Sequence, residues 1–180
     1  MEKDIKKVLI SEQEINQRCK ELGAQISQDY ASKTPILVGL LKGSVPFMAE
    51  LLKNVSVHCE TEYMAVSSYH GTSSTGEVRI IKDLDVSIEN RDIIIVEDIV
   101  DTGLTLSTII NMFLQRHARS VEIACLLDKK EGRRPGVVLH PKYVGFDVPN
   151  EFVVGFGLDY DELYRNLPYV GVLKEEVYSK

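Results

Sequence analysis

Hydrophobic positions near the start of the chain follow first a helical period and then a strand pattern. Ser11-Glu-Gln-Glu14 has the composition of a capping box, in which serine and glutamate satisfy the first free amides of a helix. The apolar residues that follow are spaced for one helical face: Ile15, Cys19, Leu22, Ile26 and Tyr30. This spacing predicts an amphipathic helix that ends before Thr34. The apolar run 36–41 predicts a buried strand, and 45–52 a second helix.

The middle of the chain alternates between strand and helix patterns. Residues 55–69 predict a long strand, and residues 78–84 a second strand that pairs back on it as a hairpin. Between them, 70–77 is rich in Gly, Ser and Thr and predicts a mobile loop. The β-branched run 92–98 is typical of the centre of a parallel sheet. Residues 104–117 predict the next helix.

Shorter apolar runs follow toward the C-terminus. Residues 121–128 predict another buried strand, and 143–146, 151–156 and 169–173 are short strand-like pieces. Strands that alternate with helices indicate an α/β fold, with a mostly parallel central sheet flanked by helices. We expect the last pieces to form a small C-terminal hood subdomain, and the hairpin to end in a long flexible loop. Residues 1–180 are expected to form a single domain.

Composition and charge limit the classes of protein. The 180 residues are 44% hydrophobic and 27% charged, with a formal net charge of −6. That balance argues against a nucleic-acid-binding role, because such binding depends on clustered Lys and Arg. The polar start lacks the apolar core of a signal peptide, and no run is long enough to span a membrane. Three scattered cysteines suit a reducing compartment, so a cytoplasmic protein is expected.

The segment IIIVEDIVDTGLTL contains the candidate chemistry. Glu97, Asp98 and Asp101 directly follow an aliphatic run, where a strand gives way to a helix. Ligands of open α/β sheets bind beyond the carboxyl ends of the strands, and backbone amides around Gly103 at a helix N-terminus would favour a phosphate. In the structural alternative, Asp101 or Thr102 caps the helix and the other acids end a solvated strand. That alternative explains a single acid well, but it explains less well why three acids lie together beside a Gly/Thr turn.

Three other motifs suggest rival functions. A hydrophobic strand that ends in acids is found in P-loop NTPases, but G-x-x-x-x-G-K-[ST] occurs nowhere in the chain. Gly155-Phe-Gly157 lacks the third glycine of a dinucleotide-binding loop. Asp83-Leu-Asp85 is similar to a phosphatase nucleophile pair, but it follows a charged stretch, and we interpret it as a surface turn.

The acidic segment resembles the phosphoribosyl-diphosphate signature of type I phosphoribosyltransferases. The resemblance to the hypoxanthine-guanine phosphoribosyltransferase family then extends over nearly the whole chain. The matching segments, in order, are GLLKGSVPFMAEL, VSSYHGTSSTGEVRIIKDL, LLDKK and YVGFDVPNEFVVGFGLDYDELYRNLPYVGVL. Several separate motifs in the right order make the match specific.

The resemblance implies roles for the acidic segment. The residues that would hold the 5′-phosphate of phosphoribosyl diphosphate follow Asp101: Thr102, Gly103, Leu104 and Thr105. Glu97 and Asp98 would face the ribose hydroxyls, where negative charge stabilises an oxocarbenium-like transition state. Asp101 would be the general base at purine N7.

The resemblance also implies residues for the purine and for a metal ion. Lys129 would donate to the 6-oxo group, Phe152 would stack on the purine, and Val153 would meet its edge through the backbone. Asp159 would lie beside the purine and the metal. The carboxylates implied for Mg²⁺ are Glu97, Asp98 and Asp159. The cation would neutralise the diphosphate at an acidic protein.

The remaining implied residues belong to the diphosphate site and to a lid. Lys42 and Gly43 resemble the diphosphate-binding loop, which often has a cis peptide in the family, and Arg165 would also reach the diphosphate. The loop around Ser68 and Tyr69 resembles a flexible lid, whose closure would protect the transfer from water.

The sequence therefore predicts Mg²⁺-dependent transfer of the phosphoribosyl group to hypoxanthine or guanine, in purine salvage. The partners are these small molecules, with no nucleic acid and no membrane. A relative that prefers xanthine, and a non-catalytic RNA-binding regulator on the same fold, are the alternatives. A homodimer or homotetramer is expected, with apolar residues near Phe47 and Met48 as a possible interface.

Overall fold

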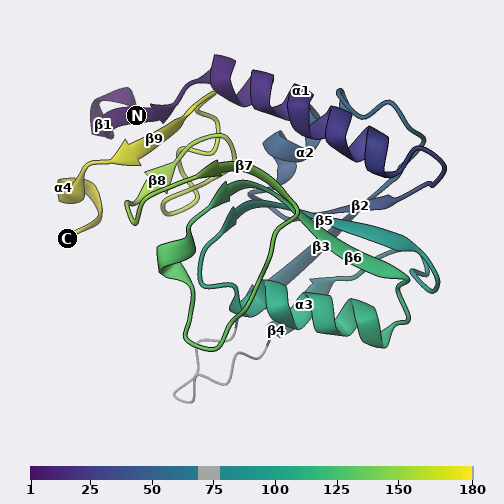
Figure 1. Ribbon diagram of the computed structural model, residues 1–180. Helices are drawn as coiled ribbons and strands as arrows, with labels where there is room; N and C mark the ends of the chain where they lie inside the picture. Colours follow the sequence, from purple (N-terminus) through teal and green to yellow (C-terminus); the bar gives the residue numbers. More distant parts are fainter. Residues whose placement is uncertain (69–77, 180) are drawn as a thin grey trace.

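The computed structural model describes residues 1–68 and 78–179 and is built around a six-stranded sheet (Figure 1). The strand order is β4-β3-β2-β5-β6-β7. The bounds are β2 Ile36–Leu40, β3 Glu60–Ser68, β4 Val78–Lys82, β5 Asp92–Val100, β6 Ser120–Asp128 and β7 Tyr143–Asp147. All neighbouring pairs are parallel except β3 and β4, which are antiparallel. The expected α/β fold with a mostly parallel sheet is confirmed.

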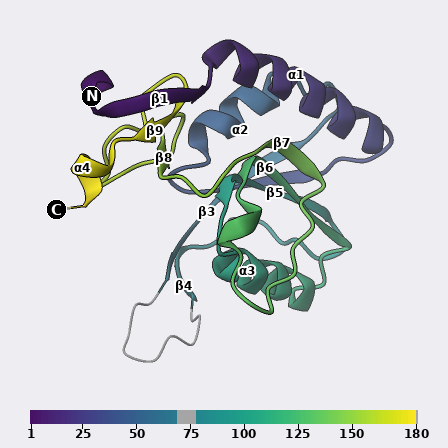
Figure 2. The same ribbon diagram turned by 60° about the vertical axis from the view of Figure 1, so that its left-hand side comes forward.

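Helices cover both faces of this sheet, as Figures 1 and 2 show from two directions. Helices α1 (Glu12–Asp29) and α2 (Val45–Leu52) lie on one face, and α3 (Leu104–Gln115) lies on the other. Alternate residues of β5 face the two layers. Ile94 packs in the cluster under α1 and α2, and Ile95 packs in the cluster over α3. Burial on both faces explains the continuous aliphatic run of β5.

The predicted helix start at residue 11 is confirmed, because the amides of Ser11 and Glu14 each donate to the side chain of the other. Several predicted elements are too long, among them the piece 151–156, of which only Val153–Val154 is a strand, and the strand 78–84, which ends at Lys82. The strand expected from residue 55 begins at Glu60, because its partner β2 begins at Ile36, opposite Glu60. The helix expected to reach residue 117 ends at Gln115, and its chain then turns through a left-handed residue.

The hood is a separate three-stranded sheet with the order β1-β9-β8. Strands β8 (Val153–Val154) and β9 (Val170–Leu173) come from the predicted C-terminal pieces, and α4 (Glu175–Tyr178) follows them. Strand β1 (Ile5–Ile10) was not predicted. Three of its first four residues are exposed, so its pattern does not alternate, and only its pairing with β9 makes it a strand. The expectation of a single domain stays a prediction.

The predicted hairpin is confirmed, since Ser68 of β3 pairs with Val78 of β4. The lid residues from Tyr69 to Gly76 lie outside the described residues. Phe47 and Met48 belong to α2 and are fully buried, whereas the nearby Leu41 and Val45 are exposed, so an interface in this region stays a prediction. Within 1–68 and 78–179, no helix is both long and apolar enough to cross a membrane.

Candidate functional site

Glu97 and Asp98 lie near the carboxyl end of β5, as the sequence predicted, although the strand continues to Val100, where it still pairs with β6. Burial and the neighbouring Asp98 charge raise the pKa of Glu97 well above its usual range. Burial also raises the pKa of Asp98, although its Oδ1 accepts the Ile99 amide at 2.8 Å. Neither carboxylate forms an ion pair with any residue that the structure describes. The fold therefore leaves these two acids without a direct ion-pair partner among the described residues.

Directly after β5, at the N-terminus of α3, lies a hollow of about the size of a phosphate group. Gly103 is the N-cap of α3, with φ of 78°, and no side chain caps the helix. The structural alternative, in which Asp101 or Thr102 is the N-cap, is therefore wrong. A cavity of about 140 Å³ lies at this end of the helix, lined by Glu97, Ile99, Val100, Asp101, Thr102, Gly103, Thr105 and Leu106. The first amides of a helix have no partner within it, so they can bind an anion here.

The backbone at Gly103 is closely packed against the segment that contains Val137 and Leu139. A Cβ at this position would lie 2.8 Å from side-chain atoms of Val137 and of Leu139. Together with its positive φ, this close packing excludes other residues at Gly103. The Arg134 amide also donates to the Thr102 carbonyl at 3.1 Å. Residues after β6 therefore form the outer wall of the anion loop.

Lys129 and Asp101 come together across the ends of β6 and β5. The Lys129 Nζ lies 3.5 Å from the Asp101 Oδ2. The Lys129 side chain is 14% exposed and that of Asp101 is 43% exposed, so Lys129 is no ordinary surface lysine. A Cβ on Gly132 would lie 1.7 Å from the Asp101 Oδ1. Only a glycine at 132 leaves room for the carboxylate in this position.

Arg133 is a structural part of the site that sequence reasoning missed. Its Nη1 donates to the carbonyls of Val100 at 2.6 Å and of Asp101 at 2.7 Å, and its Nη2 binds the buried carboxylate of Asp128. A longer contact of 3.4 Å reaches the carbonyl of Lys129. Arg133 thus fixes the backbones that carry Asp101 and Lys129. Nothing in the local pattern of the chain distinguishes Arg133 from a surface arginine.

The loop after β2 packs directly against the acids. A Cβ on Gly43 would lie 1.8 Å from the Asp98 Oδ2, and a Cβ on Gly157 would lie 2.0 Å from the Gly43 carbonyl oxygen. The Leu41–Lys42 peptide bond is cis. The Lys42 Nζ binds the Glu162 Oε2 at 2.7 Å on the surface. Gly43 of the predicted pair therefore borders Asp98, whereas the Lys42 side chain lies on the surface.

Arg165 lies near the same acids from the hood side. Its Nη1 donates to the Gly157 carbonyl at 2.7 Å, and its Nη2 lies 3.1 Å from the Asp159 Oδ1. Its Nε is buried and has no hydrogen-bond partner among the described residues. The Arg165 charge lowers the pKa of Asp98 and the Asp159 charge raises it, although burial remains the main cause of the shift. Arg165 and Asp159 are thus within electrostatic range of Asp98.

Phe152 and Val153 come from the hood. Phe152 is 38% exposed, whereas Val153 is buried and belongs to β8. The buried Val153 side chain leaves only its backbone for contact with a ligand, as the sequence reasoning assumed. The two residues lie on a different sheet from Lys129, so only the tertiary structure can place them relative to the acids.

The residues present fit a magnesium ion better than a metal with a full set of protein ligands. Among residues 1–68 and 78–179, no cluster of three His, Cys, Asp or Glu side chains could hold a metal. Mg²⁺ is usually bound by one or two carboxylates, with substrate oxygens and waters completing its shell. The Asp159 charge raises the pKa of Asp98, and these two carboxylates are the candidates for such a partial set.

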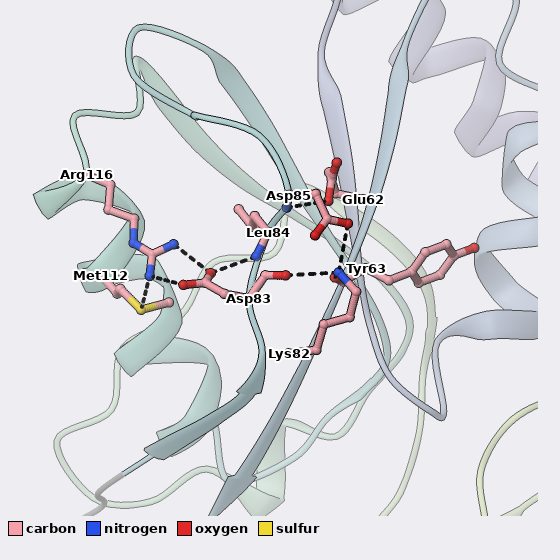
Figure 3. Close-up of polar contacts among 8 residues, drawn as sticks. All are labelled: Glu62, Tyr63, Lys82, Asp83, Leu84, Asp85, Met112 and Arg116. Atoms are coloured by element: carbon pink, nitrogen blue, oxygen red, sulfur yellow. Dashed lines mark hydrogen bonds and ion pairs between the residues drawn. The ribbon is translucent and has the colours of Figure 1, made fainter.

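The Asp83-Leu-Asp85 pair is a surface turn, as interpreted from the sequence. Figure 3 shows Arg116 of α3 donating to both carboxylate oxygens of Asp83, each at 2.7 Å. The Lys82 Nζ binds Asp85 at 3.2 Å. Both acids are exposed and paired with cations. Asp83 ties the end of β4 to Arg116 at the end of α3, whereas Asp85 pairs within its own turn with Lys82.

Comparison with known proteins gives a consistent result. Residues 9–161 match the family described as "Phosphoribosyl transferase domain". The chain is 63% identical to the hypoxanthine-guanine phosphoribosyltransferase of Streptococcus mutans, over 100% of this chain and 99% of that protein. It is also similar to a crystal structure of a hypoxanthine phosphoribosyltransferase from Staphylococcus aureus. That match has a TM-score of 0.96 and 54% identity, and it covers 100% of this chain and 97% of the other.

Proposed function

The chain belongs to the hypoxanthine-guanine phosphoribosyltransferase family, and we propose that the carboxyl ends of β5 and β6 form its active site. The protein is a purine-salvage enzyme that transfers the 5-phosphoribosyl group of phosphoribosyl diphosphate to hypoxanthine or guanine. One observation carries the site assignment. The carboxyl ends of two neighbouring strands bring together half-buried acids with raised pKa values, a helix N-terminus capped by glycine, and a lysine beside a carboxylate.

The proposed arrangement separates positive from negative groups. The 5′-phosphate binds the amides and hydroxyls of the loop that caps α3, through Thr102, Gly103, Leu104 and Thr105. Glu97 and Asp98 face the ribose hydroxyls. When the bond to diphosphate breaks, the sugar gains positive charge, and these acids stabilise it without any reorganisation.

The spacing of Lys129 and Asp101 supports their assignment to the purine. A 6-oxopurine presents O6 and N7 next to each other on one edge. The Lys129 ammonium can donate to O6, while the Asp101 carboxylate accepts the proton carried by N7. The 3.5 Å between the two side chains matches this pair of neighbouring atoms. As N7 loses its proton to Asp101, the purine becomes less positively charged in the product.

We further propose Mg²⁺ as the cofactor, held by Asp98 and Asp159, with Glu97 next to Asp98 on β5; the three-carboxylate set implied by the resemblance is not kept, because no three such side chains among the described residues could hold a metal. The ion would neutralise the diphosphate and stabilise its charge as it leaves. Gly43 borders Asp98, Lys42 precedes it in the same loop, and Arg165 lies beside Asp159, so the diphosphate would lie among these groups. The guanidinium charge of Arg165 would attract such an anion, although its Nε is buried.

Phe152 and Val153 complete the purine site in this proposal. The partly exposed ring of Phe152 would stack on the base, and the Val153 backbone would meet its edge. Base choice among hypoxanthine, guanine and xanthine would depend on this edge. Steady-state rates with the three bases would measure it.

Release of diphosphate from phosphoribosyl diphosphate tests the proposed function. We expect release only when hypoxanthine or guanine is present, and loss of release when EDTA removes Mg²⁺. Absence of turnover, together with tight RNA binding that weakens as salt rises, would instead support the regulator.

The Lys129→Ala variant tests the site within the same assay. It should raise KM for the purine by about tenfold, because one hydrogen bond from a charged group is lost. KM for phosphoribosyl diphosphate should change little. An effect confined to phosphoribosyl diphosphate would contradict the assignment of Lys129.

Three further expectations are proposed with the function. The protein acts in the cytoplasm, forms a homodimer or homotetramer, and folds as one domain over residues 1–180. Sedimentation equilibrium would measure the oligomer. A single cooperative transition seen by both far-UV and near-UV signals would support one domain.

A further inference from the structure

The ring of Phe152 has a second aromatic partner that the function described above does not use. Tyr178 of α4 stacks on it, with ring centroids 4.7 Å apart and an interplanar angle of 18°. Tyr160 meets the Phe152 ring at 5.6 Å and 86°, in an edge arrangement. Phe152 nevertheless keeps 38% of its surface exposed. Because a ring has two faces and Tyr178 covers one, the opposite face is the one left for a ligand.

The position of Tyr178 is fixed by hydrogen bonds that begin at Phe152 itself. The Leu173 amide donates to the Phe152 carbonyl at 2.9 Å, which holds the end of β9 beside this residue. The Lys174 amide then donates to the Asp4 carbonyl at 2.9 Å. From this anchored point the single turn of α4 brings Tyr178 back over the ring; Figure 1 shows α4 directly after β9.

Packing supports the same position. Val177 and Tyr178 both pack against a small buried cluster of the hood, made of Val154, Tyr164, Leu167 and Leu173. The cluster is separate from the two that hold the main sheet. The stack of Tyr178 on Phe152 is therefore held in place by the packing of the hood, and not by that of the main sheet.

We propose that Tyr178 is a positioning residue for the purine: it backs the ring of Phe152 and holds it flat, so that the base stacks on the opposite face. The proposal rests on the assignment of Phe152 to the purine in the proposed function. In the bound state the order of rings is Tyr178, Phe152, purine.

The physical reason is preorganisation. A phenyl ring on the surface turns about its side-chain bonds and must be ordered when a ligand stacks on it, which costs free energy. Tyr178 on one face and Tyr160 on the edge order the ring in advance. Offset or parallel stacking also adds attraction beyond the buried area. Loss of Tyr178 should therefore weaken purine binding and leave the phosphate end of the substrate unaffected.

The test is steady-state kinetics of the Tyr178→Ala variant of the full chain. KM for hypoxanthine should rise about three- to tenfold, as expected for the loss of one aromatic stack. The kcat value and KM for phosphoribosyl diphosphate should change less than twofold. The Tyr178→Phe variant keeps the ring and should restore KM for hypoxanthine. The matched control is Val177→Ala, which removes a neighbouring side chain of α4 from the same hood cluster but not from the stack.

Two other results would overturn the proposal, and each points to a different role for Tyr178. A lower KM for hypoxanthine in Tyr178→Ala would mean that Tyr178 occupies the purine's own face and competes with it. An equal rise in both KM values, or an equal rise in Val177→Ala, would mean that α4 only supports the fold of the hood.

The Phe152→Leu variant separates this proposal from the proposed function. If Phe152→Leu raises KM for hypoxanthine and Tyr178→Ala does not, the purine site stands and the backing role of Tyr178 is wrong. If neither variant changes KM, Phe152 does not bind the purine, and both assignments fall. Thermal unfolding of each variant would check that the fold is retained.

Discussion

Strand β5 begins with a buried carboxylate, Asp92, and has two half-buried ones, Glu97 and Asp98, near its other end. The surroundings of the two ends have opposite effects on the pKa values of these acids. At the start, the Asp92 Oδ1 accepts Arg119 Nε at 3.0 Å and Ser120 Oγ at 2.7 Å. The Arg119 hydrogen bonds lower the pKa of Asp92 to about 2. At the other end, burial raises the pKa values of both acids.

The difference shows which carboxylates serve the fold and which serve a ligand. Asp92 is 1% exposed, and the protein itself provides its cation and its hydrogen bonds, so its ionised form stabilises the folded state. Glu97 and Asp98 lack an ion-pair partner within the described part of the chain, so their ionised forms destabilise the fold. A substrate that carries positive charge, or a cation, can provide the missing compensation. The folded state is therefore less stable than it could be at the end of β5 where we propose that the reaction takes place.

The largest expected effect is on kcat, for the Asp101→Asn variant just after the carboxyl end of β5. The change removes the proton acceptor and keeps the size of the side chain, so kcat should fall about 10²- to 10⁴-fold. KM for phosphoribosyl diphosphate should change far less, because the loop amides remain. Steady-state kinetics would measure both values. An unchanged kcat would rule out Asp101 as the general base.

The next largest expected effect is on the free energy of unfolding, for the Asp92→Asn variant at the start of β5. Losing this charge should lower the free energy of unfolding by about 2–3 kcal/mol, as for a buried hydrogen bond between charged groups. Urea denaturation at pH 7 would measure the loss, and kcat should be unchanged. The matched control is Asp85→Asn, which breaks an exposed pair with Lys82 and should cost less than about 1 kcal/mol.

A pH series tests the same carboxylate without a mutation. Because the folded pKa of Asp92 is lowered to about 2 from a usual value of 3.8, its contribution is present above pH 4. It is lost as the pH falls from about 4 to 2, and the loss amounts to about 2 kcal/mol. In urea denaturation, the difference between the wild type and Asp92→Asn should therefore shrink across this range. A difference that stays constant would show that Asp92 does not act through its charge.

The smallest effect, and one of opposite sign, is expected for Glu97→Gln. The raised pKa of Glu97 means that its stabilising, protonated form predominates at low pH and is lost as pH rises. Replacing it with a neutral side chain should raise the free energy of unfolding at pH 7 by about 0.5–2 kcal/mol. Turnover should fall in the same variant, because the ribose contact is lost. A loss of stability at pH 7 would contradict the comparison between the two ends of β5.

Much of the main sheet could be predicted from the chain. Two-sided burial makes β5 a continuous aliphatic run, and one-sided burial gives α1 its helical spacing; both patterns are local. Strand β1 could not be predicted, because its exposed residues do not alternate and its pairing with β9 joins the two ends of the chain. Strand β3 was predicted too long because its partner's start decides where the ladder begins.

The sequence by itself determined the chemistry of the anion loop: acids, a glycine and threonines lie within a few residues, and their order places them at one strand-to-helix junction. Only the tertiary structure decided what surrounds that loop. It brought Lys129 and Arg133 beside Asp101, packed Gly43 against Asp98, and stacked Tyr178 on Phe152. These contacts join residues from separate strands and from the hood. Local patterns record how much of a side chain is buried, but not which distant residue buries it.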